Sequence, residues 1–295
     1  MFENLRTIFE IVLTVAFVIS VVTYIIYRLT FVREIKANIA ANRDNLANLP
    51  KKERKSLRHH LLAQVINTPY RKTVYFFADL FWVLLLVVVV RGFFFEPFVI
   101  PSGSMKPELQ IRDIILVNKY SKGLRLPISN ARLTQGDAIK RGDVIVFKYP
   151  ENPKIAYIKR VIGLPGDKVY YDNRKKMTIN GKPVTQTFTG KSEDTLTGNQ
   201  GEITTKFSVY QADLFGKKFN IQYADHYPTQ LLPREYIIPK HQYLVMGDNR
   251  DSSKDGRFFG YVDDALIIGQ AKRILLNWGC LAGDGKCDRF FKKIQ

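Results

Sequence analysis

Residues 96–115 read Glu-Pro-Phe-Val-Ile-Pro-Ser-Gly-Ser-Met-Lys-Pro-Glu-Leu-Gln-Ile-Arg-Asp-Ile-Ile. Each proline fixes its own φ and biases the residue before it towards extended geometry, and Gly103 would permit a turn that a side chain disfavours. We therefore predict a stiff, non-helical segment that presents two hydroxyls, those of Ser102 and Ser104. By itself the segment is equally consistent with a linker whose serines have no chemical role, because Ser, Gly and Pro are common loop residues.

Two apolar runs precede this segment. Residues 11–27 carry no charged side chain, and residues 74–90 are interrupted only by Asp79. A helix that crosses a bilayer needs about 20 predominantly apolar residues, with about 17 as the lower limit. We therefore predict a first transmembrane helix within residues 1–27 and a second within residues 74–92.

The positive charge of the chain is concentrated between these two runs. The formal net charge is +18, and residues 28–72 contain eleven Lys or Arg against three Asp or Glu. Because short basic loops remain on the cytoplasmic side of a membrane, we predict a cytoplasmic loop at 28–73 and a domain outside the cytoplasm at 93–295. Arg6 is the only cation before the first run, which is typical of a retained anchor and not of a cleaved secretory signal. A nucleic-acid partner is disfavoured because topology already accounts for the densest basic cluster, whereas a modestly basic outer domain suits an anionic phospholipid surface.

The chain after residue 93 is predicted to be mainly β. Short β-branched or aromatic runs bounded by Gly, Pro and Asp predict strands at residues 114–117, 144–149, 156–162, 243–246 and 266–276. Asn180-Gly181 is a strong signal for a two-residue hairpin turn. Residues 172–239 are richer in Thr, Gln, Asn, Gly and Lys, and we interpret them as an insertion, either a β-ribbon subdomain or a set of long loops. The predicted fold is an antiparallel β domain with a β-rich insertion, preceded by two transmembrane helices.

Two adjacent cations lie in the predicted strand at residues 156–162. Alternation along a strand puts Lys159 on one face and Arg160 on the other, so that one of them points towards the core. A buried lysine can lose its proton near neutral pH, because desolvation penalises the ammonium form, and it can then act as a general base. The alternative is that both side chains extend to solvent, and the strand by itself favours that alternative.

We expect neither a metal ion nor a cofactor. The four histidines have no ligand-like spacing, and two cysteines are too few for a structural zinc site, which takes four ligands. Cys280 and Cys287 could form a disulfide if their domain lies outside the cytoplasm, and the sequence leaves this pairing open. Residues 251–262 begin like an EF-hand loop, but Val262 stands where the bidentate glutamate should be, which argues against calcium.

Four motifs follow the predicted anchor in a fixed order. They are Pro101-Ser-Gly-Ser-Met105, Tyr157-Ile-Lys-Arg160, Gly163-Leu-Pro-Gly-Asp167 and Gly247-Asp-Asn-Arg-Asp-Ser-Ser253. In this combination the chain closely resembles the bacterial type I signal peptidases, also called leader peptidases. The two-span anchor and the insertion are similar to the Gram-negative form of that family. The resemblance covers about residues 74–171 and 240–278.

The resemblance implies roles for several polar residues. The nucleophile of the family falls on Ser104, and its general base falls on Lys159. The oxyanion hole of the family uses the main-chain N–H of the nucleophile and the hydroxyl two residues before it, here Ser104 and Ser102. The serine that orients the lysine matches Ser253. The supporting ion pairs of the family fall on Asp255 with Arg257 and on Asp248 with Arg160.

The resemblance also implies an apolar substrate pocket. Its positions match Phe98, Ile100, Met105, Leu109, Val146, Tyr157 and Ile158. A shallow pocket of this kind would accept alanine and reject larger side chains, which implies cleavage after an Ala-x-Ala-like sequence. Two departures from the family pattern do not touch the chemistry: Lys106 follows Met105 where an apolar residue is frequent, and Gly256 precedes Arg257 where a side chain is usual.

The activity expected from the resemblance is that of a membrane-anchored serine endopeptidase that removes N-terminal signal peptides with a Ser–Lys dyad. A serine hydroxyl is a weak nucleophile until a base takes its proton, and a neutral lysine amine can do so. Only thirteen positions separate Arg91 from Ser104, so we expect the active site at the outer membrane surface. The expected partners are signal-peptide-bearing preproteins, membrane phospholipid and the secretion translocon. The expected location is the bacterial inner membrane, with a periplasmic catalytic domain.

Two other functions compete with this one. A related Ser–Lys protease could cleave itself, but we find no convincing small-residue site on a flexible loop before Ser104. From a different class, the outer domain could be an inactive β module that binds or scaffolds envelope proteins. The presence of both Ser104 and Lys159 argues against the inactive module.

Overall fold

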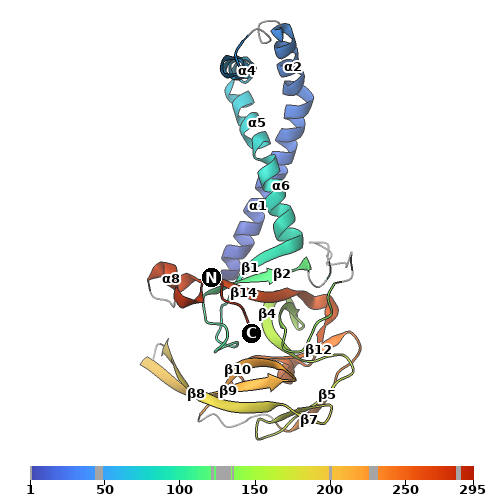
Figure 1. The fold of residues 1–295 in the computed structure, drawn as a ribbon, viewed down its shortest axis with the longest axis vertical. Coiled ribbons are helices and arrows are strands. Elements are labelled where there is room, and N and C mark those ends of the chain that lie inside the picture. Colours follow the sequence, from blue (N-terminus) through green and yellow to red (C-terminus); the bar gives the residue numbers. More distant parts are fainter. Residues whose placement is uncertain are drawn as a thin grey trace. The chain divides into compact units, whose positions relative to one another are not determined.

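The computed structural model describes residues 2–43, 49–120, 123, 134, 136–198, 201–225, 232–283 and 287–295. The chain divides into two compact units, Met1–Arg91 and Gly92–Gln295. The first unit is helical and the second is mainly antiparallel β-sheet (Figure 1). The predicted fold class is therefore confirmed.

The N-terminal unit contains two long apolar helical stretches. The first runs through α1 (Phe2–Ile26), the π-helical turn η1 (Tyr27–Phe31) and α2 (Val32–Ala41), and α4 (Lys51–Val65) follows it. The second runs through α5 (Pro69–Asp79), α6 (Phe81–Val89) and the π-helical turn η2 (Val90–Phe94). Ile8–Ala41 and Pro69–Phe94 are long and apolar enough to cross a bilayer, with mean hydropathies of 2.4 and 2.5 over their most apolar windows. Few side chains in these windows are buried, as is expected of helices that face lipid.

Helix α5 begins at a capped N-terminus. The Thr68 hydroxyl accepts a hydrogen bond from the Arg71 N–H, and Pro69 occupies the first turn, where its missing N–H leaves no intrahelical bond unmade. Further along the same stretch, the ring of Phe81 stacks on Tyr24 of α1 with 4.4 Å between ring centroids. Aromatic packing therefore joins the two apolar stretches to each other.

The second unit is built on a seven-stranded sheet with the strand order β1-β2-β14-β3-β4-β12-β13. All neighbouring strands in this sheet are antiparallel. The strands are β1 (Phe95–Val99), β2 (Asp113–Asn118), β3 (Val144–Tyr149), β4 (Asn152–Gly163), β12 (Gln242–Met246), β13 (Val262–Asp263) and β14 (Ile267–Asn277). The five predicted strands are confirmed, although β14 starts and ends one residue later than predicted because the short 3-10 turn η4 (Asp264–Leu266) precedes it.

Two smaller sheets occupy most of the chain between β4 and β12. One has the order β11-β5-β6-β7 and the other the order β10-β9-β8. Their strands are β5 (Lys168–Tyr171), β6 (Met177–Ile179), β7 (Lys182–Pro183), β8 (Thr185–Gly198), β9 (Gly201–Leu214), β10 (Lys217–Ala224) and β11 (Arg234–Ile237). The hairpin predicted at Asn180-Gly181 is confirmed: β6 pairs with β7, and both turn residues have positive φ, 51° and 76°. Within the predicted insertion, residues 199–200 and 226–231 lie outside the described part of the chain.

The smaller sheets share a buried core with the large one. Ile162 of β4 and Leu244 of β12 belong to the same apolar cluster as Val169 of β5, Ile179 of β6 and Phe219 of β10. Each of these side chains is almost fully buried, and burial of one such side chain contributes about 1.5–3 kcal/mol. Strand β4 carries the Lys159 motif, and strand β12 ends just before the Gly247 motif. Both strands therefore pack against the insertion as well as pairing within their own sheet.

Candidate active site

Ser104 lies on the loop that connects β1 to β2. The loop closes at its base, because the Ile100 N–H donates to the Asp113 oxygen at 2.8 Å and the Arg112 N–H donates to the Ile100 oxygen at 2.9 Å. The side chains of Met105 and Leu109 are fully buried within it. The loop is therefore anchored by apolar packing on both sides of a serine that is itself only 8% exposed.

The conformational role predicted for Gly103 is wrong. Its φ lies outside the left-handed region, and a Cβ at this position would meet only the flexible side chain of Lys106, at 3.4 Å. The residue of this loop with positive φ is Arg112, at 69°. The turn around Ser104 therefore does not need the backbone freedom of glycine.

Lys159 extends from β4 towards Ser104. Its side chain is 4% exposed, and its Nζ lies 2.7 Å from Ser104 Oγ and 2.8 Å from the main-chain oxygen of Ile158. The neighbouring Arg160 is fully buried as well. The hypothesis that both cations extend to solvent is therefore wrong, and β4 buries a cation on each face.

The environment of Lys159 favours the neutral amine. Burial lowers the pKa of Lys159 to about 8, although the negative charges of Asp255 and Asp248 act in the opposite direction. No carboxylate contacts Nζ within the described residues, and its two hydrogen bonds go to a hydroxyl and a carbonyl oxygen. Burial therefore lowers the pKa of Lys159 by more than the distant carboxylates raise it, and the amine can be unprotonated near neutral pH.

Ser102 and Ser253, the two further serines with expected roles, lie in contrasting environments. The hydroxyl of Ser102 is 3.4 Å from Ser104 Oγ on the exposed side of the loop. Ser253 is buried, and its hydroxyl has no hydrogen-bond partner in the described part of the chain. A direct hydrogen bond from Ser253 to Lys159, which its expected role would suggest, is therefore not formed in this structure.

Gly247 and Asn249 hold the segment after β12 against the nucleophile loop. A Cβ at Gly247 would lie 2.3 Å from Ser253 Oγ and 2.5 Å from the Ser104 main-chain oxygen, so no side chain fits there. The Asn249 N–H donates to the same Ser104 oxygen at 3.1 Å, and its side-chain amide donates to the Gly103 oxygen at 3.1 Å. Neither residue was predicted to act at the site, although both stand in the quoted Gly247–Ser253 motif.

Comparison with known proteins decides the family. Residues 73–276 match the family described as "Signal peptidase, peptidase S26". The chain belongs to this family. The resemblance drawn from the four motifs is confirmed, and the chain is a membrane-anchored signal peptidase, an enzyme that removes signal peptides from preproteins.

Similar proteins carry the same name. The chain is 41% identical over 209 residues to a "Signal peptidase I" of Pseudomonas aeruginosa, covering 67% of this chain and 70% of the relative. It is 33% identical over 270 residues to a "Signal peptidase I" of Haemophilus influenzae, covering 77% of each. A crystal structure of a signal peptidase I from Enterococcus faecalis V583 is 28% identical, covers 45% of this chain and 97% of its own, and has a TM-score of 0.26.

The signal peptidase has two buried ion pairs that involve the Gly247 motif and the segment after it. Arg160 forms a two-pronged pair with Asp248, with distances of 2.8 and 2.7 Å, and its remaining nitrogen donates to the Gly142 oxygen. Arg257 pairs with Asp255 at 2.8 and 2.9 Å, and Asp255 also accepts from the Gly247 N–H. Burial alone would raise the pKa of Asp255, but the charge and hydrogen bonds of Arg257 keep that pKa below its usual value. The lowered pKa favours the charged form of Asp255, and both ion pairs hold the Gly247 motif in place.

Six of the seven residues expected to line the substrate pocket lie in one buried cluster. They are Phe98, Ile100, Met105, Leu109, Val146 and Ile158. Tyr157 instead packs against a neighbouring cluster, where its ring stacks on Tyr149 at 4.4 Å, although it also lies 5.4 Å from Lys159 Nζ. The cluster therefore joins the Ser104 loop to β4.

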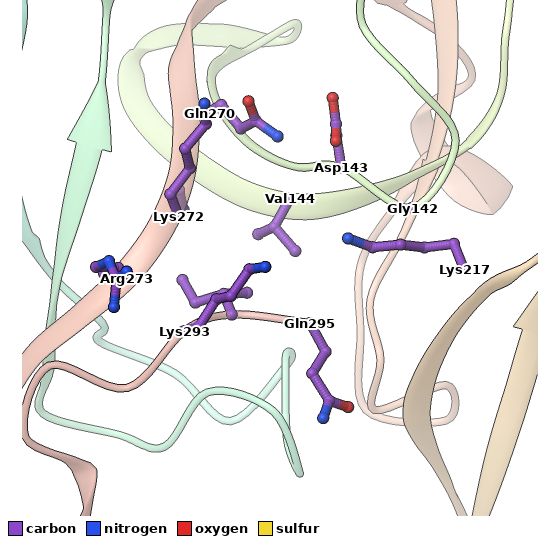
Figure 2. A pocket seen from close by; sticks show the side chains of 11 residues that line it. Gly142, Asp143, Val144, Lys217, Gln270, Lys272, Arg273, Lys293 and Gln295 are labelled. Atoms are coloured by element: carbon purple, nitrogen blue, oxygen red, sulfur yellow. The ribbon is translucent and has the colours of Figure 1, made fainter.

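The structure also contains a cavity of about 290 Å³ (Figure 2). Its lining includes Val144, Lys217, Lys272 and Lys293, and it contains neither Ser104 nor Lys159. Figure 2 shows the amines of Lys217 and Lys293 pointing towards Val144. This cavity is therefore not the site at which Ser104 and Lys159 meet. No group of three or more His, Cys, Asp or Glu side chains suited to a metal occurs among the residues that the structure describes.

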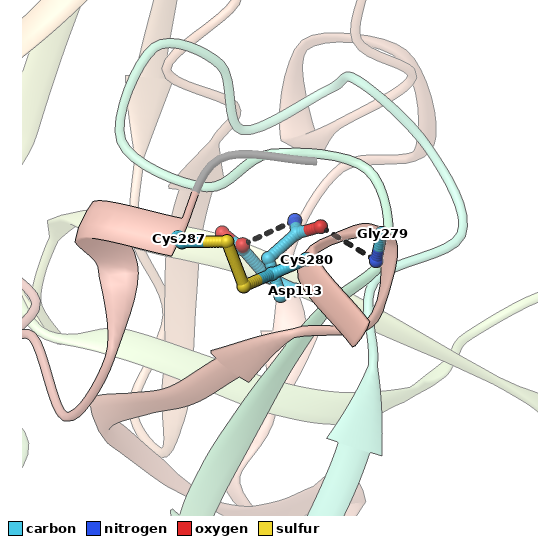
Figure 3. Close-up of a disulfide and its surroundings, with 5 residues drawn as sticks. Asp113, Gly279, Cys280 and Cys287 are labelled. Carbon is cyan, nitrogen blue, oxygen red and sulfur yellow. Dashed lines mark hydrogen bonds between the residues drawn. A yellow bond between two sulfur atoms is a disulfide. The ribbon is translucent and has the colours of Figure 1, made fainter. Parts of the chain in front are cut away.

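The C-terminal segment forms hydrogen bonds with the Ser104 loop and with the start of β2. Cys280 and Cys287 form a disulfide (Figure 3), which resolves the pairing that the sequence left open. Two residues further on, buried Arg289 donates to the Asp113 carboxylate, at 2.6 Å for its closest contact, and to the Glu108 oxygen at 2.7 Å. Asn277 Nδ2 also donates to Asp113, at 2.8 Å (Figure 3). Sequence reasoning missed these contacts, because nothing in the spacing of Arg289 points to a residue 176 positions earlier.

Proposed function

We propose that this signal peptidase cleaves its substrate with a Ser–Lys dyad in which Ser104 is the nucleophile and Lys159 is the general base. The observation that carries the proposal is the 2.7 Å distance between Lys159 Nζ and Ser104 Oγ, at an amine that is almost fully buried. At this distance a neutral amine can take the hydroxyl proton directly. With a pKa of about 8, about one lysine in ten is neutral at pH 7.

The reaction proceeds in two halves. Ser104 Oγ attacks the scissile carbonyl carbon while its proton moves to Lys159 Nζ, and Lys159 then gives that proton to the departing amino group of the mature protein. The signal peptide remains as an ester on Ser104. Lys159 next takes a proton from water, whose oxygen attacks the ester carbonyl. Lys159 then returns that proton to Ser104 Oγ as the ester bond breaks, which releases the signal peptide and regenerates the neutral amine and the free hydroxyl.

The negative charge that develops on the carbonyl oxygen needs donors that are already in position. We assign this role to the main-chain N–H of Ser104 and the hydroxyl of Ser102, which lies close enough to Ser104 to reach the same oxygen. Loss of one such donor typically raises the barrier by about 2.7–4 kcal/mol. The Arg160–Asp248 and Arg257–Asp255 pairs are assigned supporting roles because they position the segment that contacts the Ser104 main chain. Ser253 is assigned the role of orienting Lys159, which the family resemblance implies.

Specificity would come from the apolar residues beside the dyad. Phe98, Ile100, Met105, Leu109, Val146 and Ile158 form one buried cluster, with Tyr157 at its border beside Lys159. These residues match the substrate-pocket positions of the family, where a shallow apolar pocket would accept alanine and reject larger side chains. We infer cleavage after an Ala-x-Ala-like sequence.

The proposed location is the bacterial inner membrane. The helices within residues 1–27 and 74–92 would cross it, the basic segment 28–73 would remain in the cytoplasm, and the catalytic unit 93–295 would lie in the periplasm. The disulfide between Cys280 and Cys287 supports an oxidising compartment. Phospholipid and the secretion translocon would then be the neighbours from which signal peptides reach the enzyme.

The dyad is tested by preprotein cleavage with the purified full chain in detergent or lipid. Ser104→Ala and Lys159→Ala should each lose activity by at least about 100-fold, the lower end of what a general base contributes. The matched control is Lys168→Ala. This variant removes an exposed lysine of β5 that pairs with Glu235 of β11, and it should cleave the preprotein at the wild-type rate. Cleavage by Lys159→Ala at more than a tenth of the wild-type rate would refute the dyad.

Specificity is tested with the substrate. Replacing the alanine before the scissile bond of a preprotein by phenylalanine should abolish processing by the wild-type enzyme. Processing at an unchanged rate would refute the pocket while leaving the dyad in place.

A further inference from the structure

An ion pair joins the Ser104 loop to the β8–β9 hairpin. Lys106 stands two residues after Ser104, and its Nζ lies 2.6 Å from Asp194 Oδ2 on β8. The two side chains are 11% and 29% exposed, so this pair is screened less by water than a pair on the open surface. Lys106 is also one of the two positions where the chain departs from the family pattern.

The hairpin has an inner and an outer face. Residues opposite each other in an antiparallel pair share a face, as do residues two apart in one strand. Asp194 is opposite Thr205 and Ser192 is opposite Phe207, so Asp194 and Phe207 share a face. Phe207 is 4% exposed, whereas Glu193 and Lys206 on the other face are 59% and 62% exposed. The face that carries Asp194 is therefore the one turned towards the protein.

One edge of the hairpin pairs with no strand among the residues that the structure describes. Strands β8 and β9 are fourteen residues each, and β8 lies at the edge of its three-stranded sheet. In the part of the chain that the structure describes, β8 pairs with β9 and with no other strand. An edge strand of this kind offers main-chain N–H and C=O groups to an extended polypeptide.

We propose that the Lys106–Asp194 ion pair holds the β8–β9 hairpin beside Ser104, where the edge of β8 receives the mature part of the preprotein. The inference rests on the proposed role of Ser104. The location of β8 identifies the segment that would bind there. A preprotein that is cleaved at Ser104 must extend beyond the residues next to the scissile bond, and a single side chain, that of Lys106, spans the distance from the Ser104 loop to β8. Lys106 and Asp194 are positioning residues, because they act through the hairpin and not on the reacting atoms.

The test compares a whole preprotein with a short peptide that spans the same cleavage site, using the full chain in detergent. Lys106→Met and Asp194→Asn should each raise KM for the preprotein about 3- to 5-fold, the range for loss of one partly screened charge pair. The kcat for the preprotein, and both constants for the peptide, should not change. Lys106→Arg keeps the charge and should restore the wild-type KM. The double variant that exchanges the two charges, Lys106→Asp with Asp194→Lys, should have a lower KM for the preprotein than either of its two single variants.

Glu193→Gln is the matched control. It removes a carboxylate one residue from Asp194, but the partner of Glu193 is Lys206 of the same hairpin, at 3.6 Å, so KM for the preprotein should stay at the wild-type value. The inference is overturned if Asp194→Asn leaves KM for the preprotein unchanged, or raises KM for the peptide equally. Failure of the wild type itself to cleave the peptide would instead count against the proposed function.

Discussion

Lys159 and Arg160 are consecutive residues of β4, and both side chains are buried, but on opposite faces of the sheet. On one face, Arg160 meets the carboxylate of Asp248 at two atoms and stacks on the ring of Phe219. On the other face, the nearest polar partners of Lys159 are the hydroxyl of Ser104 and a carbonyl oxygen. The first face gives its cation a carboxylate partner, and the second favours the loss of a proton from Lys159.

The difference shows what makes a buried cation useful as a base. A charge that loses its hydration remains stable only beside an opposite charge with good hydrogen-bond geometry. Lysine without such a partner lowers its pKa, here to about 8, whereas a guanidinium remains charged in any protein environment. Each of the following experiments breaks or sharpens this contrast.

The largest effect is expected from Lys159→Arg. Arginine would fill the same space, but it cannot deprotonate and would be buried without a carboxylate in contact. Preprotein cleavage should fall by about 10²–10⁴-fold, the contribution of a general base. Lys168→Arg serves as the control for the exchange itself. Substantial activity in Lys159→Arg would mean that some other group takes the Ser104 proton.

Asp248→Asn should have the next largest effect, and on stability. The change leaves the Arg160 guanidinium buried without its counter-charge, which typically costs about 3–5 kcal/mol. Unfolding of the full chain in detergent, followed by near-ultraviolet circular dichroism, measures the loss. Glu235→Gln, which breaks the exposed pair with Lys168, should cost less than about 1 kcal/mol. Equal losses in the two variants would show that burial does not distinguish the pairs.

The pH dependence of cleavage tests the same contrast at Lys159. The protonated amine cannot accept the Ser104 proton, so kcat/KM should rise with pH and level off above the pKa of about 8. Below that value it should fall by about tenfold for each pH unit. Asp248 is one of the charges that raise this pKa, and Asp248→Asn should therefore move the midpoint to lower pH. A midpoint near that of free lysine in the wild type would contradict a desolvated base.

The smallest effect on stability is expected from Ser253→Ala. The buried hydroxyl has no hydrogen-bond partner in the described residues, so its removal should change the free energy of unfolding by less than about 0.5 kcal/mol. If Ser253 supports Lys159 during the reaction, activity will nevertheless fall while stability is kept. A loss of stability above about 1 kcal/mol, the usual net value of a hydrogen bond, would show that the hydroxyl is bonded in solution.

Local signals in the sequence predicted the elements well where one interaction dominates. The Asn180-Gly181 turn is one such place, because positive φ at two consecutive residues selects these residue types. The two apolar stretches are another, because the length of a membrane-spanning helix is set by the bilayer. Gly103 shows the limit of such reasoning: a glycine between two prolines nearby in the chain suggested a turn that a side chain disfavours, yet the φ of Gly103 lies outside the left-handed region.

The packing of the site could not be predicted in the same way. Strand alternation required Lys159 and Arg160 to face opposite sides, but it could not say that both sides were buried. It also could not place Asp248, 88 residues from Arg160, on one side only. The contacts of Arg289 with Asp113 and of Lys106 with Asp194 are equally remote in sequence, and no local pattern encodes them.

The order of the motifs, the two apolar stretches and the alternating strand were therefore determined by the sequence alone, since each depends on residues close together in the chain. Strand alternation did not say which of two adjacent cations receives a carboxylate and which receives a hydroxyl; the family resemblance implied the arrangement, and the tertiary structure shows it. The protonation of a buried group depends on the charges and the water around it, and those surroundings come from segments that meet only after the chain has folded.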